Sequence, residues 1–256
     1  MAVDRTAPGE SVTFRALSLL DAFDEKHRVL SLSQIARRTG TPLATAHRRL
    51  RDLVDGRILQ QRTDGLFEIG ARTWHLGQLA RPTSMREAAL PYLQDLVVRT
   101  GHTVHVGVRD GLSALVVDRL ARSRSTATRH TPGSRLPLHS TALGNVLLAF
   151  APDLVQEQVM ARLTPFTPFT VTDREVLRQQ LARVRAARLA ESVQQNRLGA
   201  ASLAVPVFGV GQTVVAAIAV IATTETNLAA LEEPLRACAH SVARAVEEHD
   251  RQWYEE

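Results

Sequence analysis

The sequence of 256 residues has little cysteine, few aromatic residues and no long apolar run. Its single cysteine, Cys238, excludes an intramolecular disulfide framework and any zinc site built from several cysteines. The longest strongly apolar run, 214–222, is far shorter than the roughly 20 residues with which a helix crosses a bilayer. Because a chain of this length buries a core unaided, we expect a cytoplasmic protein of one or two domains with no membrane contact, metal or cofactor.

Lysine is also scarce, since Lys26 is the only lysine among 31 basic residues. Arginine bias in a genome explains that preference, but it does not explain where the charge lies. The window 37–62 holds seven arginines and two acidic residues, Asp52 and Asp55. Its net charge of +5 equals the formal net charge of the whole chain. A basic patch on an otherwise neutral chain predicts a polyanionic partner at one place. The arginines of this window are Arg37, Arg38, Arg48, Arg49, Arg51, Arg57 and Arg62.

The same region has the pattern of a winged helix-turn-helix. Apolar residues at helical spacing predict a first helix over 12–25, with Phe14, Leu17, Leu20 and Phe23 on one face. Ser31 and Gln34 form a capping-box pattern for a short helix that ends at Gly40. Thr41 then reads as an N-cap with Pro42 at the first helical position. A hairpin around Asp64-Gly65 follows and predicts the wing.

The second predicted helix carries the candidate DNA-reading residues. With Ala46, Leu50 and Leu53 inward, arginines on the opposite face reach the major groove, where guanidinium forks bind guanine. Arg62 on the wing is positioned for a phosphate or the minor groove. We assign DNA binding to Ser33, Thr41, Ala44, Thr45, His47, Arg48, Arg49, Arg51 and Arg62. A merely solvated basic helix is the alternative for this helix taken alone.

After residue 70 the pattern changes to linking helices and then to an α+β domain. Helices are predicted over 71–80 and 85–100, with Pro82 as a hinge or kink between them. Strands follow at 104–108, 112–120 and 126–131, then three helices near 139–150, 152–163 and 172–188. Strands at 202–208 and 213–223 and a last helix over 227–251 complete the domain. We expect a disordered arm over 1–11, a winged domain over 12–77, linker helices over 78–100 and an effector domain over 101–256.

Several segments resemble the IclR family of bacterial transcription regulators. They are LSLSQIA at 30–36 with TAHR at 45–48, PGSRLPLHSTALG at 132–144, and Gly199 followed by AVPV at 204–207. The resemblance implies a GAF-like effector domain, a homodimer or dimer of dimers on a pseudo-palindromic operator in double-stranded DNA, and repression or activation set by a small metabolite. The family usually has lysine where this chain has Asn145, and acidic residues where it has Gln194 and Gln195.

The resemblance also places a ligand pocket. We expect backbone N–H groups at the start of the 139–150 helix to bind an anionic or carbonyl oxygen. Ala219 and Ile221 stand where some acid-binding relatives carry hydroxyls, which predicts an aromatic or medium-sized organic acid. The effector site is assigned to Val106, Thr141, Ala142, Leu143, Ser192, Ser202, Ala219 and Ile221.

An enzyme or ligand carrier with an accessory basic domain is the alternative function. The spacing of His102 and His105 suggests a metal site. However, strand alternation is expected to place them on opposite faces, with no further metal ligand nearby. His139, within the 132–144 segment, is expected to cap or orient its loop. The sequence has no G-x-S-x-G elbow, phosphate-binding loop or dinucleotide fingerprint. We therefore predict a DNA-binding regulator, a repressor, with no catalytic residues.

Overall fold

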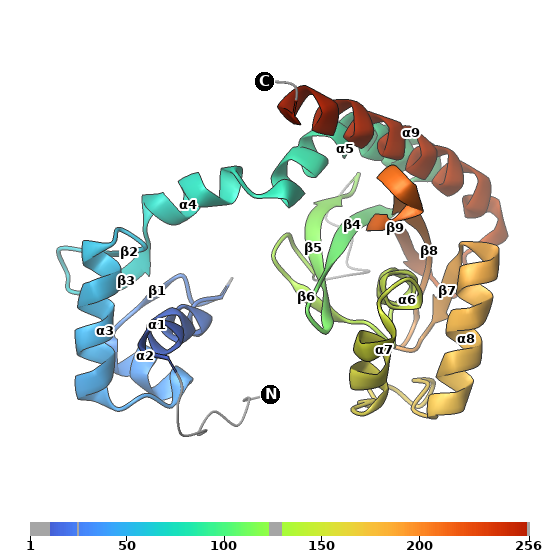
Figure 1. Ribbon diagram of the computed structural model, residues 1–256. Coiled ribbons are helices and arrows are strands. Elements are labelled where there is room, and N and C mark those ends of the chain that lie inside the picture. Colours follow the sequence, from blue (N-terminus) through green and yellow to red (C-terminus); the bar gives the residue numbers. More distant parts are fainter. Residues whose placement is uncertain (1–10, 25, 123–129, 255–256) are drawn as a thin grey trace. The chain divides into compact units, whose positions relative to one another are not determined.

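A computed structural model describes residues 11–24, 26–122 and 130–254, and side chains at all of these except 81–84 and 249–254. The chain divides into two compact units, Met1–Ala80 and Arg81–Glu256, here called the N-terminal and C-terminal units (Figure 1). Of the predicted arm over 1–11, only Ser11 is described, as the N-cap of the first helix. Within the described residues, no helix combines the length and the apolar character needed to span a membrane.

The N-terminal unit is a winged helix-turn-helix. Its core is a cluster of ten buried apolar residues from the 3-10 turn, the two helices of the helix-turn-helix and the three strands of the small sheet. The wing is a three-stranded antiparallel sheet in the order β1-β3-β2, in which β1 is an additional strand that the sequence analysis did not predict. The elements are α1 (Val12–Leu17), a 3-10 helix η1 (Ser18–Ala22), β1 (Val29–Leu30), α2 (Leu32–Thr39), α3 (Leu43–Asp55), β2 (Leu59–Gln61), β3 (Phe67–Ile69) and α4 (Ala71–Gln78).

The first predicted helix is shorter than expected, and of its predicted apolar face Leu20 and Phe23 pack partly against the core. The α-helix ends at Leu17, and the chain tightens into a 3-10 turn that ends at Ala22. Because a 3-10 turn holds three residues instead of 3.6, the inward face moves, and Leu19 and Ala22 enter the core. Phe14 stays 47% exposed.

The turn between α2 and α3 follows from its capping residues. Ser31 and Gln34 form the predicted capping box, and Gly40 ends α2 in the left-handed conformation at φ 65°. The start of α3 lies one residue later than predicted. Pro42 is the N-cap, at ψ 139°, because its carbonyl accepts the hydrogen bond from the Ala46 N–H.

The C-terminal unit contains a six-stranded antiparallel sheet in the order β6-β5-β4-β9-β8-β7. Helices α5 and α9 pack together over one face, and α6 covers the other face with α7 and α8 against it (Figure 1). The elements are α5 (Arg81–Thr100), β4 (Thr103–Asp110), β5 (Ser113–Leu120), β6 (Arg135–Pro137), α6 (Ala142–Ala149), α7 (Asp153–Met160), α8 (Arg174–Ala187), β7 (Ala190–Val193), β8 (Ala200–Phe208), a 3-10 turn η2 (Val210–Gln212), β9 (Val214–Thr223) and α9 (Ala229–Tyr254).

Helix α6 is buried along its whole length, and glycine makes its close approach possible. A Cβ atom on Gly144 would lie 2.5 Å from the Pro137 carbonyl oxygen and 2.6 Å from the Leu138 Cα. A Cβ atom on Gly107 in β4 would lie 2.8 Å from Leu143 Cδ2. These two glycines therefore let the first turn of α6 sit directly against β4 and the segment after β6.

Several predicted boundaries in this unit are wrong. The predicted strand at 126–131 lies outside the described residues up to 129, and His130 and Thr131 belong to no strand. The two edge strands, β6 and β7, were not predicted. Helix α5 begins at Arg81, so Pro82 stands in its first turn, where a missing N–H costs nothing, and the helix break falls at Leu79–Ala80.

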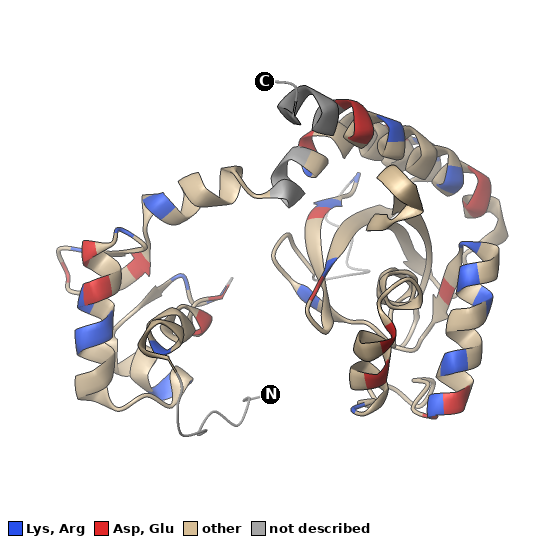
Figure 2. Ribbon diagram, in the orientation of Figure 1, with Lys and Arg blue, Asp and Glu red and all other residues tan. Residues whose placement is uncertain are grey.

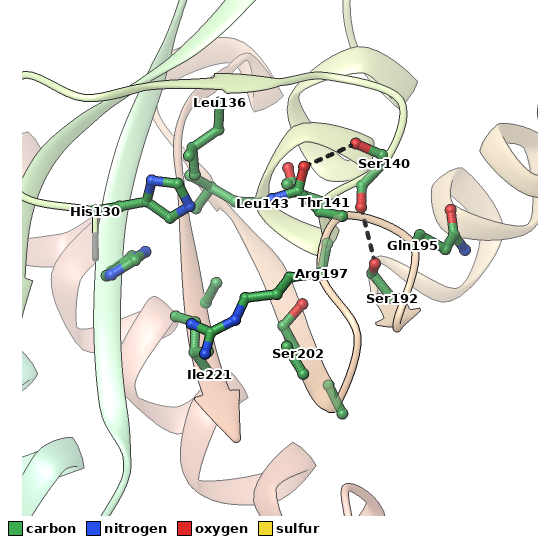
Figure 3. A pocket seen from close by; sticks show the side chains of 16 residues that line it. His130, Leu136, Ser140, Thr141, Leu143, Ser192, Gln195, Arg197, Ser202 and Ile221 are labelled. Carbon is green, nitrogen blue, oxygen red and sulfur yellow. Dashed lines mark hydrogen bonds between the residues drawn. The ribbon is translucent and has the colours of Figure 1, made fainter. Parts of the chain in front are cut away.

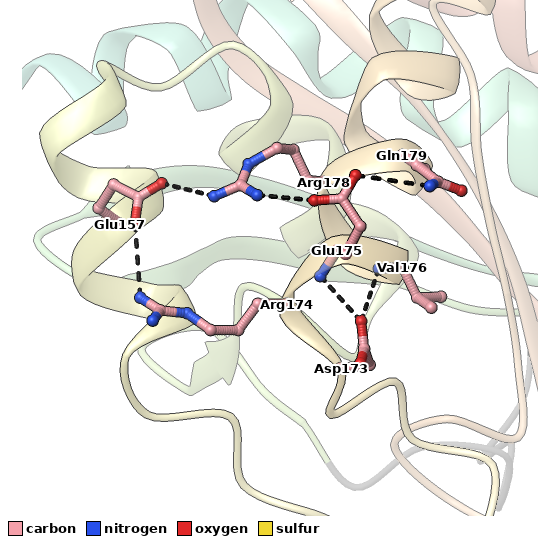
Figure 4. Close-up of polar contacts among 7 residues, drawn as sticks. All are labelled: Glu157, Asp173, Arg174, Glu175, Val176, Arg178 and Gln179. Atoms are coloured by element: carbon pink, nitrogen blue, oxygen red, sulfur yellow. Dashed lines mark hydrogen bonds and ion pairs between the residues drawn. The ribbon is translucent and has the colours of Figure 1, made fainter.

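Helices α7 and α8 are joined by exposed ion pairs. Glu157 on α7 contacts Arg178 at 3.0 Å and Arg174 at 3.5 Å, and Arg178 also pairs with Glu175 at 2.8 Å (Figure 4). Asp173 caps α8 by accepting from two backbone N–H groups. Exposed pairs of this kind contribute little each, so burial of the apolar faces of these helices holds them to α6.

Candidate nucleic-acid interface and ligand cavity

Helix α3 presents one basic face to solvent. Ala46, Leu50 and Leu53 are at most 6% exposed, and the helix turns about 100° per residue, which directs Arg48 and Arg51 away from the core. Figure 2 shows the resulting basic bands on α3. This arrangement fits a helix that enters the major groove.

The arginines of α3 are not equivalent. Arg49 pairs with Asp52 at 3.3 Å, and its side chain is only 15% exposed. Arg48 and Arg51 are exposed, and neither forms an ion pair with the side chains that the structure describes. Arg48 and Arg51 are therefore available for DNA, whereas Arg49 is held against its own helix.

The wing places Arg62 beside two carboxylates. Its guanidinium lies 3.2 Å from Asp64 and 3.7 Å from Glu68. The backbone N–H of Leu66 and the Arg62 side chain hold the pKa of Asp64 below its usual value, so the aspartate stays charged. The positive charge of Arg62 is thus partly neutralised before any phosphate approaches.

The remaining predicted DNA residues surround the start of α3. Ala44 and His47 are exposed, and Thr45 is half-buried. The hydroxyl of Ser33 shares a hydrogen bond with that of Ser31, and the hydroxyl of Thr41 accepts one from Thr39, each at 3.0 Å. Ser33 and Thr41 therefore have local roles in the turn as well.

The C-terminal unit contains a cavity of about 440 Å³ between the sheet and the first turn of α6 (Figure 3). This volume is within the range of small-molecule sites. The sheet supplies one wall through β4, β8 and β9, and the loop between β7 and β8 supplies the rim. The lining residues are His105, His130, Leu136, Ser140, Thr141, Ala142, Leu143, Ser192, Gln195, Asn196, Arg197, Ala200, Ala201, Ser202, Ala219 and Ile221.

Seven of the eight predicted effector residues line this cavity, and Val106 does not. In β4, alternate side chains point to opposite faces of the sheet. His105 faces the cavity, so Val106 faces the other side, where it is fully buried in the core under α5 and α9. The assignment of Val106 to the site is wrong for this reason.

The charge of the cavity comes from Arg197, which was not predicted from the sequence. Arg197 reaches in from the loop between β7 and β8, with Ser202 and His130 nearby (Figure 3). No acidic side chain of the described residues lines the cavity, whereas an arginine guanidinium is always protonated. The position of Arg197 two residues before Gly199 is the signal in the sequence that could have identified it.

Other polar groups of the cavity are bonded to one another. Ser192 Oγ donates to the Ser140 carbonyl at 3.0 Å, and Ser140 Oγ donates to Asn196 Oδ1 at 3.3 Å. The Thr141 hydroxyl accepts from the Gly144 N–H at 3.0 Å and donates to the Pro137 carbonyl at 2.9 Å. These bonds fix the start of α6 relative to β7 and its loop.

The rim loop is held from outside by a segment that repeats Thr-Pro-Phe at 164–169. The hydroxyls of Thr167 and Thr170 donate to the carbonyls of Gln194 and Gln195, both at 2.6 Å. His139 Nε2 lies 3.0 Å from the Thr164 carbonyl oxygen, and burial lowers the pKa of His139 while this hydrogen bond opposes the shift. His139 therefore orients this segment.

The histidines build no metal centre among the described residues, where no three metal-binding side chains come together. The expectation that His102 and His105 alternate along one strand is wrong, because β4 begins at Thr103 and His102 precedes it. Of these two histidines, His105 lines the cavity and His102 does not.

Comparisons with known proteins agree across the chain. The model of the IclR helix-turn-helix domain matches residues 12–63, and that of the bacterial transcriptional regulator IclR C-terminal domain matches residues 78–244. The HTH-type transcriptional regulator XynR of Escherichia coli is 30% identical over 240 residues, covering 91% of this chain and 95% of that protein. The glycerol operon regulatory protein of Streptomyces coelicolor is 32% identical over 236 residues, covering 91% and 93%.

A solved structure is also similar over nearly the whole chain. It is an IclR homologue from Microbacterium hydrocarbonoxydans in complex with 4-hydroxybenzoate, 28% identical, with a TM-score of 0.83 over 92% of this chain and 99% of that one.

Proposed function

Because the chain belongs to the IclR family of bacterial transcriptional regulators, we propose that it is a repressor whose affinity for its operator is set by a small organic acid bound in the C-terminal cavity. Like these relatives, which are named transcriptional regulators, it is a DNA-binding regulator and not an enzyme. The proposal concerns the sign of regulation and the ligand that controls it.

The observation that carries the proposal is the charge of the cavity. Its described lining includes Arg197 and no carboxylate, and it adjoins the first turn of α6. The Gly144 N–H of that turn is capped by the Thr141 hydroxyl, whereas the N–H groups of Ala142 and Leu143 have no acceptor within the helix and favour negative charge. An anionic ligand gains from both features, whereas a cationic ligand would meet repulsion.

The apolar part of the lining limits the kind of acid. Leu143, Ala219 and Ile221 present hydrocarbon to the ligand, so an acid with an aromatic or alkyl body buries more apolar surface there than a two-carbon acid does. The relative crystallised with 4-hydroxybenzoate binds an acid of this kind. We propose an aromatic or medium-sized organic acid as the effector.

The active form is proposed to be a homodimer on a pseudo-palindromic operator. One recognition helix reads too few base pairs to locate a site in a genome. The N-terminal unit exposes large apolar side chains that its own core does not use: Trp74 on α4 is 72% exposed, Leu79 at the C-cap of α4 is 67% exposed, and Leu17 on α1 is 49% exposed. Exposed apolar surface of this extent is typical of an interface. A monomer in sedimentation at micromolar concentration, with and without DNA, would contradict this part of the proposal.

The experiment is a thermal-shift screen of organic acids, followed by fluorescence anisotropy with the DNA upstream of the gene. A ligand that binds only the folded state raises the melting temperature. We expect an acid to raise it in the wild type and in Arg183→Gln, which removes an exposed arginine of α8, but much less in Arg197→Gln. The same acid is expected to release the DNA. An equal response in all three proteins would contradict the role of the cavity.

A further inference from the structure

We propose that His105 is a specificity-determining residue of the cavity, which binds an uncharged hydroxyl group of the effector. This inference rests on the proposed function, because it assigns the second polar contact of the same organic acid. It concerns the sheet wall of the cavity, away from the residues that resemble the family's motifs.

His105 lies in the middle of β4, paired with Arg119 of β5 on one side and Ala219 of β9 on the other. It is only 2% exposed, and it lines the cavity. Its Nε2 atom is buried and has no hydrogen-bond partner among the described residues. A buried polar atom without a hydrogen-bond partner destabilises the fold. A ligand in the cavity that offers a polar group to Nε2 would remove this cost.

The other side chains of the cavity do not satisfy this atom. The hydroxyls of Ser140, Ser192 and Thr141 are used in the bonds that fix the start of α6. The ring of His130 stands edge-on at 6.4 Å between centroids, which is a packing contact. None of the residues that the structure describes supplies the polar group that would complete the site, and we assign it to the ligand.

The charge state of the ring selects the kind of group. Burial, together with the nearby charges of His130 and Arg119, lowers the pKa of His105 to about 3, so the ring is neutral at physiological pH. A neutral imidazole carries one donor and one acceptor nitrogen. A hydroxyl can both donate and accept, so it pairs with Nε2 in either tautomer, whereas an apolar end leaves that atom unpaired.

The test uses acids that differ by one hydroxyl. Binding of benzoate, phenylacetate and hexanoate to the full-length wild type is measured by calorimetry beside 4-hydroxybenzoate, 3-hydroxybenzoate, 4-hydroxyphenylacetate and 6-hydroxyhexanoate. We expect at least one hydroxylated acid to bind about tenfold or more tightly than its parent, as for a buried hydrogen bond that is made instead of lost.

Three variants assign this difference to His105. His105→Phe should remove the preference for the hydroxyl while the parent acid still binds, and His105→Gln, which keeps a polar nitrogen at a similar reach, should restore part of it. His102→Phe is the matched control, since His102 precedes β4 and does not line the cavity, and it should keep the full preference. Circular dichroism of each variant checks that it is folded.

The outcomes separate this inference from the proposed function. If parent acids bind as well as their hydroxylated partners and release the DNA, the role of His105 is wrong and the proposed function stands. A preference that survives in folded His105→Phe also overturns the inference. If no acid of the panel binds the wild type, the inference is wrong, and the proposed acid effector fails with it.

Discussion

Replacement of Arg48 by alanine tests whether α3 reads bases. Arg48 lies on the face of α3 opposite the buried Ala46 and Leu50, and no described side chain forms an ion pair with it. Its guanidinium is therefore free to bind a guanine edge in the major groove. Alanine at this position keeps the helix propensity and removes only the contact with DNA.

The size of the effect follows from one bidentate contact in each half-site. Such a contact discriminates against the wrong base by about 1–3 kcal/mol. If a dimer places one α3 in each half-site, the two losses add to roughly 2–6 kcal/mol on the operator. On random DNA the same substitution removes only a nonspecific charge, so the loss there is much smaller.

The assay is fluorescence anisotropy at fixed salt, with the upstream DNA and a scrambled duplex of equal length. Arg37→Ala is the charge-matched control, because Arg37 is exposed on α2 within the same basic window. The Arg37→Ala substitution should weaken binding to both duplexes about equally. Equal losses on the two duplexes for Arg48→Ala would refute its assignment as a base-reading residue.

Four further substitutions or conditions test other parts of the account. Arg62→Ala should weaken binding to all sequences about equally and lower the salt slope by less than one, since its two acidic neighbours already offset its charge; titration in increasing salt checks this. Ser31→Ala removes the capping box of α2 and should cost about 1 kcal/mol of unfolding free energy in urea. Cys238 should resist thiol reagents at pH 8 until the protein is denatured, because burial raises the pKa of its thiol to about 12. His105 is neutral in the folded state and takes up a proton on unfolding below pH 6.5, so stability should fall as the pH drops from 6.5 toward 3, and less so in His105→Gln; urea unfolding at each pH measures this.

The winged helix was predictable because its signals are local. The capping box at Ser31, the left-handed Gly40 and the three inward residues of α3 each depend on neighbours within a few positions. The error at Pro42 is a shift by one residue, of the kind that depends on which carbonyl accepts the first helical hydrogen bond. The first helix failed because its 3-10 turn is set by packing against α2 and not by propensity.

The ligand cavity was only partly predictable, because tertiary pairing builds it. The resemblance to the family motif located Thr141 and Leu143, which lie at the N-cap and in the first turn of α6. It could not show that β4 turns His105 toward the cavity and Val106 away, since that depends on the phase of the strand against β9. Arg197 was missed because its loop reaches the cavity only through the pairing of β7 with β8 in the sheet, which the sequence does not reveal.

The most direct test of the central claim is a measurement of coupling in both directions. The dissociation constant of the wild type for its upstream DNA is measured with and without the acid that gives the largest thermal shift, and the dissociation constant for that acid is measured with and without the DNA. We expect the acid to weaken DNA binding by a factor of about 5–150, and DNA to weaken acid binding by the same factor. An acid that binds in the cavity while DNA affinity stays unchanged would contradict the account.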